Sequence, residues 1–250
     1  MPALRAALWG LVAGSALIIG AFAGYFARTP QRLVAAVMAF GSGVLISALS
    51  FDLMDKAYRQ GGFIFTGLGF IGGAILFTAL NWFLSRKGAK HRKRSGDQQP
   101  SEQEHEGSGL SLALGALLDG IPESIVIGLS IIKGGAVSAV AVAAIFLSNI
   151  PEAWSSSAGM KKAKRSSLYV FGIWSGIAII SGLAALAGYA VFSGFSDEII
   201  AATTAVAAGA ILAMLADTMI PEAFAEAHDL AGLITVCGFL LAFVLTKLEQ

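Results

Sequence analysis

Two short polar stretches, Asp119-Gly120-Ile121-Pro122-Glu123-Ser124 and Ser148-Asn149-Ile150-Pro151-Glu152-Ala153, each interrupt a long apolar run. A carboxylate near the middle of a bilayer is costly, so it is rarely found there without a function. A proline inside a helix removes one backbone hydrogen bond and leaves a carbonyl one turn earlier without its donor. Because each stretch combines both features, the pair predicts a cation site built from two membrane helices.

The composition is that of a membrane protein that crosses the bilayer several times. The chain has 250 residues, of which 56% are hydrophobic and 13% charged, and its mean hydropathy is +0.75. A soluble domain has about 25% charged residues. The apolar runs are continuous rather than alternating, which predicts an all-α bundle and excludes a barrel. Eight runs are long enough to span the hydrocarbon: 3–26, 32–54, 63–84, 109–132, 136–160, 168–192, 198–221 and 231–248.

The distribution of Lys and Arg predicts the orientation. Most of them fall in loops on one side, above all in the segment 85–107 after the third span. The positive-inside rule therefore places this loop in the cytoplasm and both termini outside. The loop lacks apolar periodicity, so we expect disorder there, although His91 and His105 could hold metal weakly. Ala21-Phe22-Ala23 is similar to a signal-peptidase site, but the long apolar run favours an uncleaved span.

An internal similarity relates the two ends of the chain. Residues 43–49 (GVLISAL) resemble residues 209–215 (GAILAML), and the two spans run in opposite directions. This favours inverted copies of spans 1–3 and 6–8, with spans 4 and 5 as a second inverted pair, a plan common in transporters. The alternative is that spans rich in glycine, alanine and leucine look alike by composition.

The two polar stretches are expected to meet at one depth. Asp119 and Glu123 are four residues apart, as are Ser148 and Glu152, so each pair shares a helix face. Both lie ten to twelve residues into their spans by our count, near mid-bilayer. Oxygen ligands with several negative charges suit a divalent cation, while the alternative is a set of carboxylates bonded for packing or relaying protons. The predicted metal ligands are Asp119, Glu123, Ser148, Asn149 and Glu152.

Further acidic residues lie where spans 2 and 7 end. Asp52 and Asp55 are on the outer side and predict an entry mouth, whereas Asp217 and Glu222 are on the inner side and predict an exit. Acidic residues at helix ends are also often merely solvated. With the central site these residues predict a path on which one helix bundle moves against the other.

At the two polar stretches the chain resembles the ZIP family of divalent metal transporters, bacterial type. That family carries H-N-x-P-E-G in span 4 and H/Q-N/E-x-P-E in span 5. The resemblance implies a 3+2+3 arrangement of eight helices, transport into the cytoplasm across the bacterial inner membrane, and ligation by Asp119, Glu123 and Glu152, with Ser148 and Asn149. Both family histidines are absent here, and Gly120 replaces an asparagine.

These departures favour one metal position over two. They also favour a site that prefers divalent ions with an affinity for oxygen ligands. The expected cargo is Zn²⁺, Mn²⁺, Fe²⁺, Mg²⁺ or Cd²⁺, and the expected surroundings are the lipid bilayer. We expect no nucleic-acid partner and no enzyme activity, because HExxH is absent and the spans hold no Ser/His pair. A metal-binding sensor or scaffold, or a proton-coupled carrier of another solute, remains the alternative. The glycine-rich face at 69–73 permits a homodimer.

Overall fold

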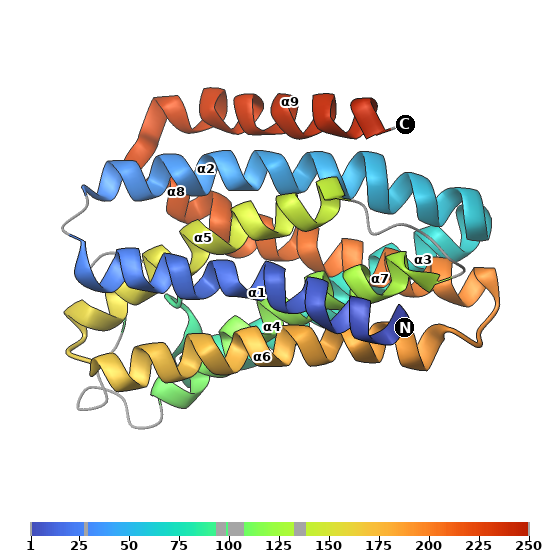
Figure 1. Cartoon of the computed structure of the whole chain (residues 1–250). Helices are drawn as coiled ribbons and strands as arrows, with labels where there is room; N and C mark the ends of the chain where they lie inside the picture. Colours follow the sequence, from blue (N-terminus) through green and yellow to red (C-terminus); the bar gives the residue numbers. More distant parts are fainter. Residues whose placement is uncertain (1, 28–29, 94–98, 100–107, 133–138, 250) are drawn as a thin grey trace.

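The computed structural model describes residues 2–27, 30–93, 99, 108–132 and 139–249. All regular structure in these ranges is helical, which confirms the predicted all-α class. The helices lie side by side along one long axis, and both termini lie at the same end of the bundle (Figure 1). The chain thus crosses the length of the bundle repeatedly, as the apolar runs predict.

The first half of the chain forms α1 (Pro2–Phe26), α2 (Gln31–Ala48) and α3 (Asp55–Leu84). Wider π-helical turns follow α2 and α3, namely η1 (Leu49–Met54) and η2 (Ser85–Ala89). The chain turns back within α3 at Gly62, whose φ of 67° and ψ of −174° are not helical. Glycine is favoured there because a side chain would be strained at positive φ.

The second half forms the remaining helices in the described ranges. They are α4 (Ser108–Ser130), α5 (Ala139–Lys162), α6 (Ser167–Phe192), α7 (Asp197–Met214), the π-helical η4 (Leu215–Met219), α8 (Ile220–Ala227), the short 3₁₀ turn η5 (His228–Leu230) and α9 (Ala231–Glu249). Each apolar run predicted from the sequence is helical over its described residues, except that the run 109–132 leaves the α-helix after Ser130.

Within the described residues, six stretches are long and apolar enough to cross a membrane. One of them, 31–89, contains α2 and α3 together and is folded back at Gly62. The helix α5 does not reach the same apolar level, although it has 24 residues. The apolar level of α5 is lower because its sequence contains Asn149, Glu152 and several serines. The six stretches are Pro2–Phe26, Gln31–Ala89, Leu110–Ser130, Ser167–Phe192, Asp197–Ala225 and His228–Leu248.

The helix pairs repeat across the bundle. Helix α2 packs on α9 while α7 packs on α3, and α1 packs on α5 while α6 packs on α4. Glycines allow the close approach in both members of the first set. A Cβ at Gly43 would run into the Thr235 carbonyl on α9, and one at Gly209 would run into the Phe70 carbonyl on α3.

The similar segments 43–49 and 209–215 also occupy similar places. Helices α2 and α7 each have 18 residues. Each ends one residue before the last leucine of its segment, and a π-helical turn begins at Leu49 in one case and at Leu215 in the other. The resemblance of the two segments therefore extends from sequence to local structure.

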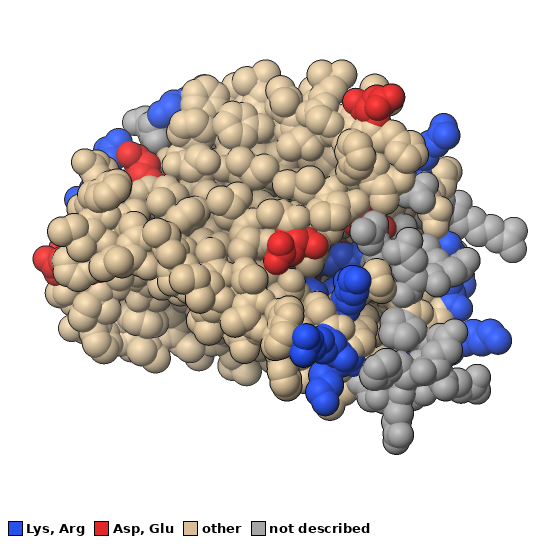
Figure 2. All heavy atoms as spheres, turned by 180° about the vertical axis from the view of Figure 1, so that it is seen from behind, with Lys and Arg blue, Asp and Glu red and all other residues tan. Residues whose placement is uncertain are grey.

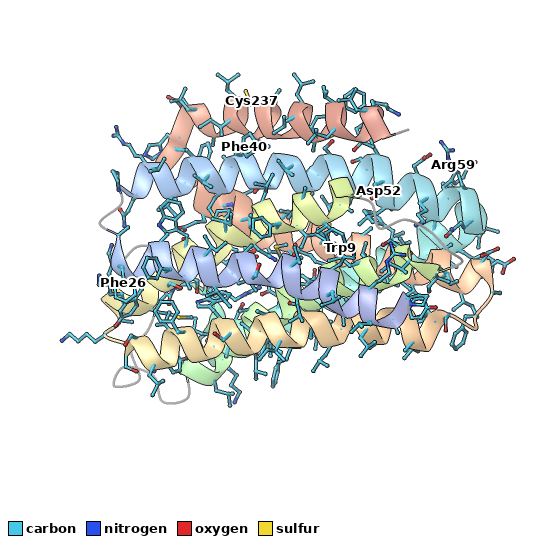
Figure 3. All side chains as sticks on the ribbon, in the orientation of Figure 1. Trp9, Phe26, Phe40, Asp52, Arg59 and Cys237 are labelled. Atoms are coloured by element: carbon cyan, nitrogen blue, oxygen red, sulfur yellow. The ribbon has the colours of Figure 1, made fainter. Side chains whose placement is uncertain are left out.

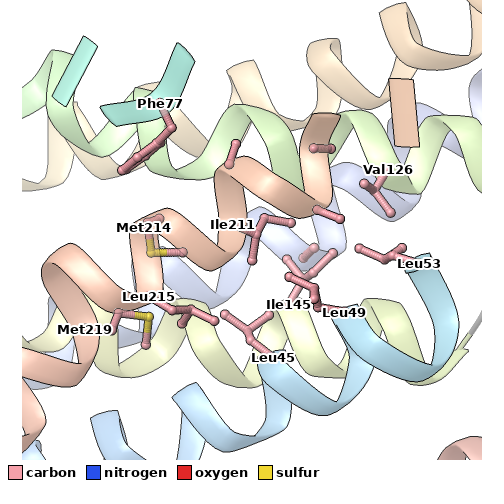
Figure 4. Packing of buried hydrophobic residues seen from close by; sticks show 14 of the residues in the cluster. Leu45, Leu49, Leu53, Phe77, Val126, Ile145, Ile211, Met214, Leu215 and Met219 are labelled. Atoms are coloured by element: carbon pink, nitrogen blue, oxygen red, sulfur yellow. The ribbon is translucent and has the colours of Figure 1, made fainter. Parts of the chain in front are cut away.

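The main hydrophobic core fills the bundle between α2, α4, α5 and α7 (Figure 4). Leu49, Leu53, Val126 and Ile145 are buried in it. A small cavity of about 20 Å³ remains beside this core and is lined by Asp52, among others. Apolar packing therefore closes the bundle between Asp52 and the two polar stretches.

The outer faces of the helices are apolar. Leu233, Val236 and Leu240 on α9 are all more than half exposed, and Cys237 lies on the outer side of the same helix (Figure 3). Charged side chains are sparse over most of the face in Figure 2, and Lys and Arg gather toward one end of it. This distribution is typical of a multi-pass membrane protein.

The expected disorder of 85–107 does not extend to residues 85–93. These residues form η2 and a turn, and Ala89, Arg92 and Lys93 are buried. Residues 94–98 and 100–107, including His105, lie outside the described residues. The sequence suggested a solvated segment because it is rich in Lys and Arg, but buried acidic residues elsewhere supply partners for two of those cations.

Candidate functional site

Asp119 and Glu123 lie one turn apart on α4, which continues through Pro122. Each is only 1% exposed. Burying an unpaired carboxylate is very unfavourable, so such groups are normally paired, hydrogen-bonded or bound to metal. The partners of these two carboxylates therefore decide what the site does.

The α5 residues of the predicted site are buried as well, but they point to different partners. The Ser148 hydroxyl donates to the Ile145 carbonyl at 2.9 Å within its own helix. The Asn149 amide nitrogen donates to the Ala13 carbonyl at 3.0 Å and so ties α5 to α1. Glu152 lies one turn farther along α5. It contacts the same cation as Asp119 of α4.

That shared cation is the ammonium of Lys93. Its Nζ lies 2.9 Å from Glu152 Oε2 and 3.4 Å from Asp119 Oδ2. It also lies 3.0 Å from the sulfur of Met214 on α7. The structure thus brings Asp119 and Glu152 together, as the sequence predicts, around a positive charge.

A second cation, Arg92, completes the cluster. Its Nε and Nη2 each donate to one oxygen of Asp119 at 2.8 Å, a bidentate pair of the strongest type. Its Nη1 donates to the Asn81 side-chain oxygen at 2.8 Å, and Asn81 in turn donates to Asp217 at 3.3 Å. The predicted exit residue Asp217 is therefore connected to the central carboxylate through Arg92.

Glu123 differs from the other two carboxylates. Neither of its oxygens has a hydrogen-bond partner among the described residues. It does interact electrostatically with Glu152, Lys93 and Asp119, so it belongs to the same cluster. Buried polar atoms without partners are rare in proteins, and these two oxygens are available to a ligand.

In the described residues, no group of three or more His, Cys, Asp or Glu side chains is arranged to hold a metal ion. The predicted ligands are near one another but do not converge on one point. The ammonium of Lys93 stands between Asp119 and Glu152, and the guanidinium of Arg92 is paired with Asp119. Ser148 and Asn149 are bonded to backbone carbonyls. The cluster as it stands is a set of ion pairs.

The predicted entry residues are not equivalent. Asp55 forms an exposed pair with Arg59 at 2.9 Å within α3. Asp52 lines the small cavity together with Lys56 and Thr204. Figure 3 shows Asp52 and Arg59 near the same end of the bundle.

The predicted exit residue Glu222 is buried and lies close to the cluster. Its Oε1 is 3.0 Å from the Ser155 hydroxyl, one turn beyond Glu152 on α5. The same hydroxyl donates to the backbone carbonyl of Lys93. Glu222 therefore lies next to the backbone of Lys93, on the route from the central carboxylates to the end of α5.

The chain contains a third Ile-Pro-Glu sequence, Ile220-Pro221-Glu222, of which only Glu222 was predicted to be functional. Pro221 lies at the start of α8, directly after the π-helical turn η4. The three Pro-Glu pairs thus place Glu123 and Glu152 in the central cluster and Glu222 beside it. Counting this tripeptide in the sequence would have linked α8 to the site.

Sequence reasoning also missed Arg92, Lys93 and Met214. The two cations were assigned to a solvated loop, and the methionine was read as part of an apolar span. One signal was available, since buried carboxylates in a membrane require counter-charges. The run of basic residues between spans 3 and 4 is the nearest source of such charges along the chain.

The helices and the buried ionisable cluster define a class: a polytopic helical membrane protein with charged residues inside the bundle, which in such proteins mark ion or substrate pathways. The chain is 30% identical over 137 residues to the zinc transporter ZTP29 of Arabidopsis thaliana, a match covering 50% of each protein. The chain thus spans about half the length of this curated relative. No family model matches the chain.

Proposed function

We propose that this chain carries divalent metal cations into the cytoplasm through a site between α4 and α5. The observation that carries the proposal is that Asp119 and Glu152, from two helices, both contact one buried cation, the Lys93 ammonium. A site that holds an ammonium between two carboxylates has the charge to hold a metal ion. The relative named as a zinc transporter supports transport rather than enzyme activity.

Glu123 is the third proposed ligand. Its two oxygens have no hydrogen-bond partner among the described residues, and it lies within electrostatic range of both other carboxylates. A divalent ion bound among the three carboxylates would give the Glu123 oxygens a direct cationic contact, which the ion pairs of Asp119 and Glu152 do not give them. Ser148 and Asn149 are proposed as further oxygen ligands that would have to turn from their present backbone partners.

The proposed membrane arrangement is eight spans in a 3+2+3 inverted repeat of the ZIP type. It is supported by the equal lengths of α2 and α7, by the π-helical turn after each, and by the mirrored pairs α2–α9 and α7–α3. The polar α5 is the least apolar of the proposed spans. The basic loops support the proposed orientation, in which both termini lie outside the bacterial inner membrane.

The proposed route runs from Asp52 to the central carboxylates and then past Asp217 and Glu222. The apolar core closes the route next to Asp52, because the cavity there has room for about one water molecule. Transport therefore requires the helices to move apart at that end. Alternating access about a central site provides such a movement.

The proposed donors are mostly oxygens, which suit Mn²⁺, Fe²⁺ and Mg²⁺. The Met214 sulfur, 3.0 Å from the Lys93 ammonium, adds one soft donor at the same point. A thioether extends the range of a carboxylate site toward softer ions such as Cd²⁺. We therefore propose a broad divalent selectivity that includes Zn²⁺.

The ion pairs also favour a second candidate, a membrane scaffold or sensor in which the carboxylates hold residues 92 and 93 in place. In that case Asp119 and Glu152 are already satisfied and have no need of a metal. The two candidates differ in whether the carboxylates exchange their partners.

Calorimetry on the purified chain separates the candidates. Zn²⁺, Mn²⁺, Fe²⁺, Mg²⁺ and Cd²⁺ are titrated into the wild type, Glu123→Gln and Glu123→Gln/Glu152→Gln. Transport predicts saturable binding that weakens in the single variant and disappears in the double variant. Absence of binding to the wild type and to variants with the basic residues removed would favour the scaffold.

A further inference from the structure

The proposed cation site already contains a cationic occupant that comes from the chain itself. Residues 89–93, which begin at the last residue of η2, turn back into the bundle, where Arg92 and Lys93 are 2% and 3% exposed. Full burial of two neighbouring cations is unusual and requires specific partners. Those partners are the same carboxylates that the proposed function assigns to the metal ion.

Resting on that function, we propose that Arg92 and Lys93 determine the affinity of the site by competing with the metal. The two side chains and the divalent ion use the same oxygens of Asp119 and Glu152. A metal ion therefore binds only after the segment 89–93 has withdrawn. The apparent dissociation constant of the metal equals its intrinsic dissociation constant divided by the fraction of molecules in which the segment is withdrawn.

Charge balance makes the exchange feasible. Arg92 and Lys93 together bring two positive charges, and so does one divalent ion. Replacing one by the other leaves the formal charge around Asp119 and Glu152 unchanged, so neither carboxylate is buried without a counter-charge. The withdrawn side chains regain hydration, because the basic segment connects to exposed residues such as Lys87 and Lys90.

The bundle is shaped to receive the segment. A Cβ at Gly115 on α4 would lie 2.5 Å from Arg92 Cδ and 3.3 Å from the Cβ of Ala89. Gly115 therefore provides the space in which Arg92 reaches Asp119. Gly88, with φ of 102°, turns the chain just before the inserted residues, a conformation that a side chain would oppose.

Backbone contacts hold the inserted segment at its far end. The Gln99 side-chain amide donates to the Arg92 carbonyl at 3.1 Å and to the Ser156 carbonyl at 3.0 Å. The Ser155 hydroxyl donates to the Lys93 carbonyl. Ser155 and Ser156 belong to α5, so the proposed withdrawal of the segment breaks these hydrogen bonds as well as the ion pairs.

The first test measures binding of Zn²⁺ and Mn²⁺ to the full chain by calorimetry. Arg92→Ala/Lys93→Ala is expected to bind at least about tenfold more tightly than the wild type, as for a site that is ~90% occupied by its competitor. Lys87→Ala/Lys90→Ala removes two exposed charges of the same region and is expected to leave the affinity unchanged.

A second variant leaves every charge in place. Gly115→Val fills the space used by Arg92 and is expected to tighten metal binding in the same direction. Gly176→Val on α6 is the matched control, because nothing lies within 4 Å of a Cβ at that position. This pair keeps the test valid if removal of the two cations impairs folding.

A third readout is independent of metal. Ser155→Cys in a Cys237→Ser background places a single buried thiol under the Lys93 backbone. We expect slow reaction with a water-soluble maleimide, and at least about tenfold faster reaction when Gly115→Val is added.

Equal metal affinities in the wild type, Arg92→Ala/Lys93→Ala and Gly115→Val would overturn the competition while leaving the transport function intact. Absence of metal binding in all of these proteins would overturn both. Metal binding that appears only in Arg92→Ala/Lys93→Ala and in Gly115→Val would support both the competition and the proposed transport function.

Discussion

Arg92 and Asp119 form a buried bidentate ion pair in which two guanidinium nitrogens each lie 2.8 Å from a carboxylate oxygen. The two residues are 2% and 1% exposed. In the sequence Arg92 precedes the segment 94–107, and Asp119 follows it. The pair fixes the end of the basic segment to the middle of α4. It is therefore the contact on which both the stability of this conformation and access to the carboxylates depend.

The first prediction concerns the stability of this pair. Arg92→Ala leaves Asp119 buried with Lys93 as its remaining cation and is expected to destabilise the fold by about 1.5–3 kcal/mol, because the bidentate hydrogen bonds to a charged group are lost. Arg92→Ala/Asp119→Ala removes both charges and is expected to recover part of that loss. Thermal unfolding in detergent measures the cycle, and additive effects of the two single substitutions would contradict the coupling.

The second prediction separates the two proposed entry residues. Asp55 is exposed and paired with Arg59 on the same helix, and such pairs contribute about 0–1 kcal/mol. Asp55→Ala is therefore expected to change neither stability nor uptake appreciably. Asp52→Asn alters the lining of the small cavity and is expected to lower metal uptake at least about tenfold, as for loss of one charged group on the path.

Uptake into cells that express each variant at equal levels checks this difference. An equal loss of metal uptake in Asp52→Asn and Asp55→Ala would assign the entry to both acidic residues. A loss of uptake in Asp55→Ala alone would contradict the route through Asp52.

The third prediction tests the mirrored helix pairs. A Cβ at Gly43 would meet the α9 backbone, and one at Gly209 would meet the α3 backbone, in the same way. Gly43→Ala and Gly209→Ala are each expected to destabilise the protein by about 1–3 kcal/mol through overpacking. Gly67→Ala is the control, because nothing lies within 4 Å of its added Cβ. Unfolding midpoints that fall in only one of the two variants would argue against an inverted repeat.

The fourth prediction concerns the choice of ion. Met214→Leu keeps a similar volume and removes the sulfur that lies 3.0 Å from the Lys93 ammonium. Transport of Cd²⁺ is expected to fall relative to transport of Mn²⁺, because a thioether favours the softer ion. Competition of the two ions in one uptake assay gives the ratio directly, and an unchanged ratio would exclude the sulfur from the site.

The sequence predicts the helices well because each apolar run is long, continuous and bounded by polar residues. It also predicts that Asp119, Glu123 and Glu152 lie together, since a shared depth and spacing follow from helix geometry alone. The partners of these carboxylates could not be predicted in the same way. They depend on a turn at Gly88 and on a space at Gly115, and both arise from tertiary packing rather than from local pattern.

Asn149 illustrates the same limit. Its position beside Ser148 predicts a ligand, whereas the structure turns its amide nitrogen to the Ala13 carbonyl on α1. Which neighbour a buried amide selects depends on the helix that packs there, and α1 is far away in sequence. Helix depth is a local property of the chain, but the choice of a hydrogen-bond partner is not.

The most direct test of the central claim is metal flux through the purified chain in liposomes. Glu123 is the best position, because its oxygens have no hydrogen-bond partner among the described residues and Glu123→Gln breaks no ion pair. Glu198→Gln, exposed in the first turn of α7, is the control. The account predicts saturable entry of Mn²⁺ or Zn²⁺ in the wild type and in the control, and at least about a tenfold loss in Glu123→Gln, as for removal of a charged ligand. Equal flux in all three proteins would contradict it.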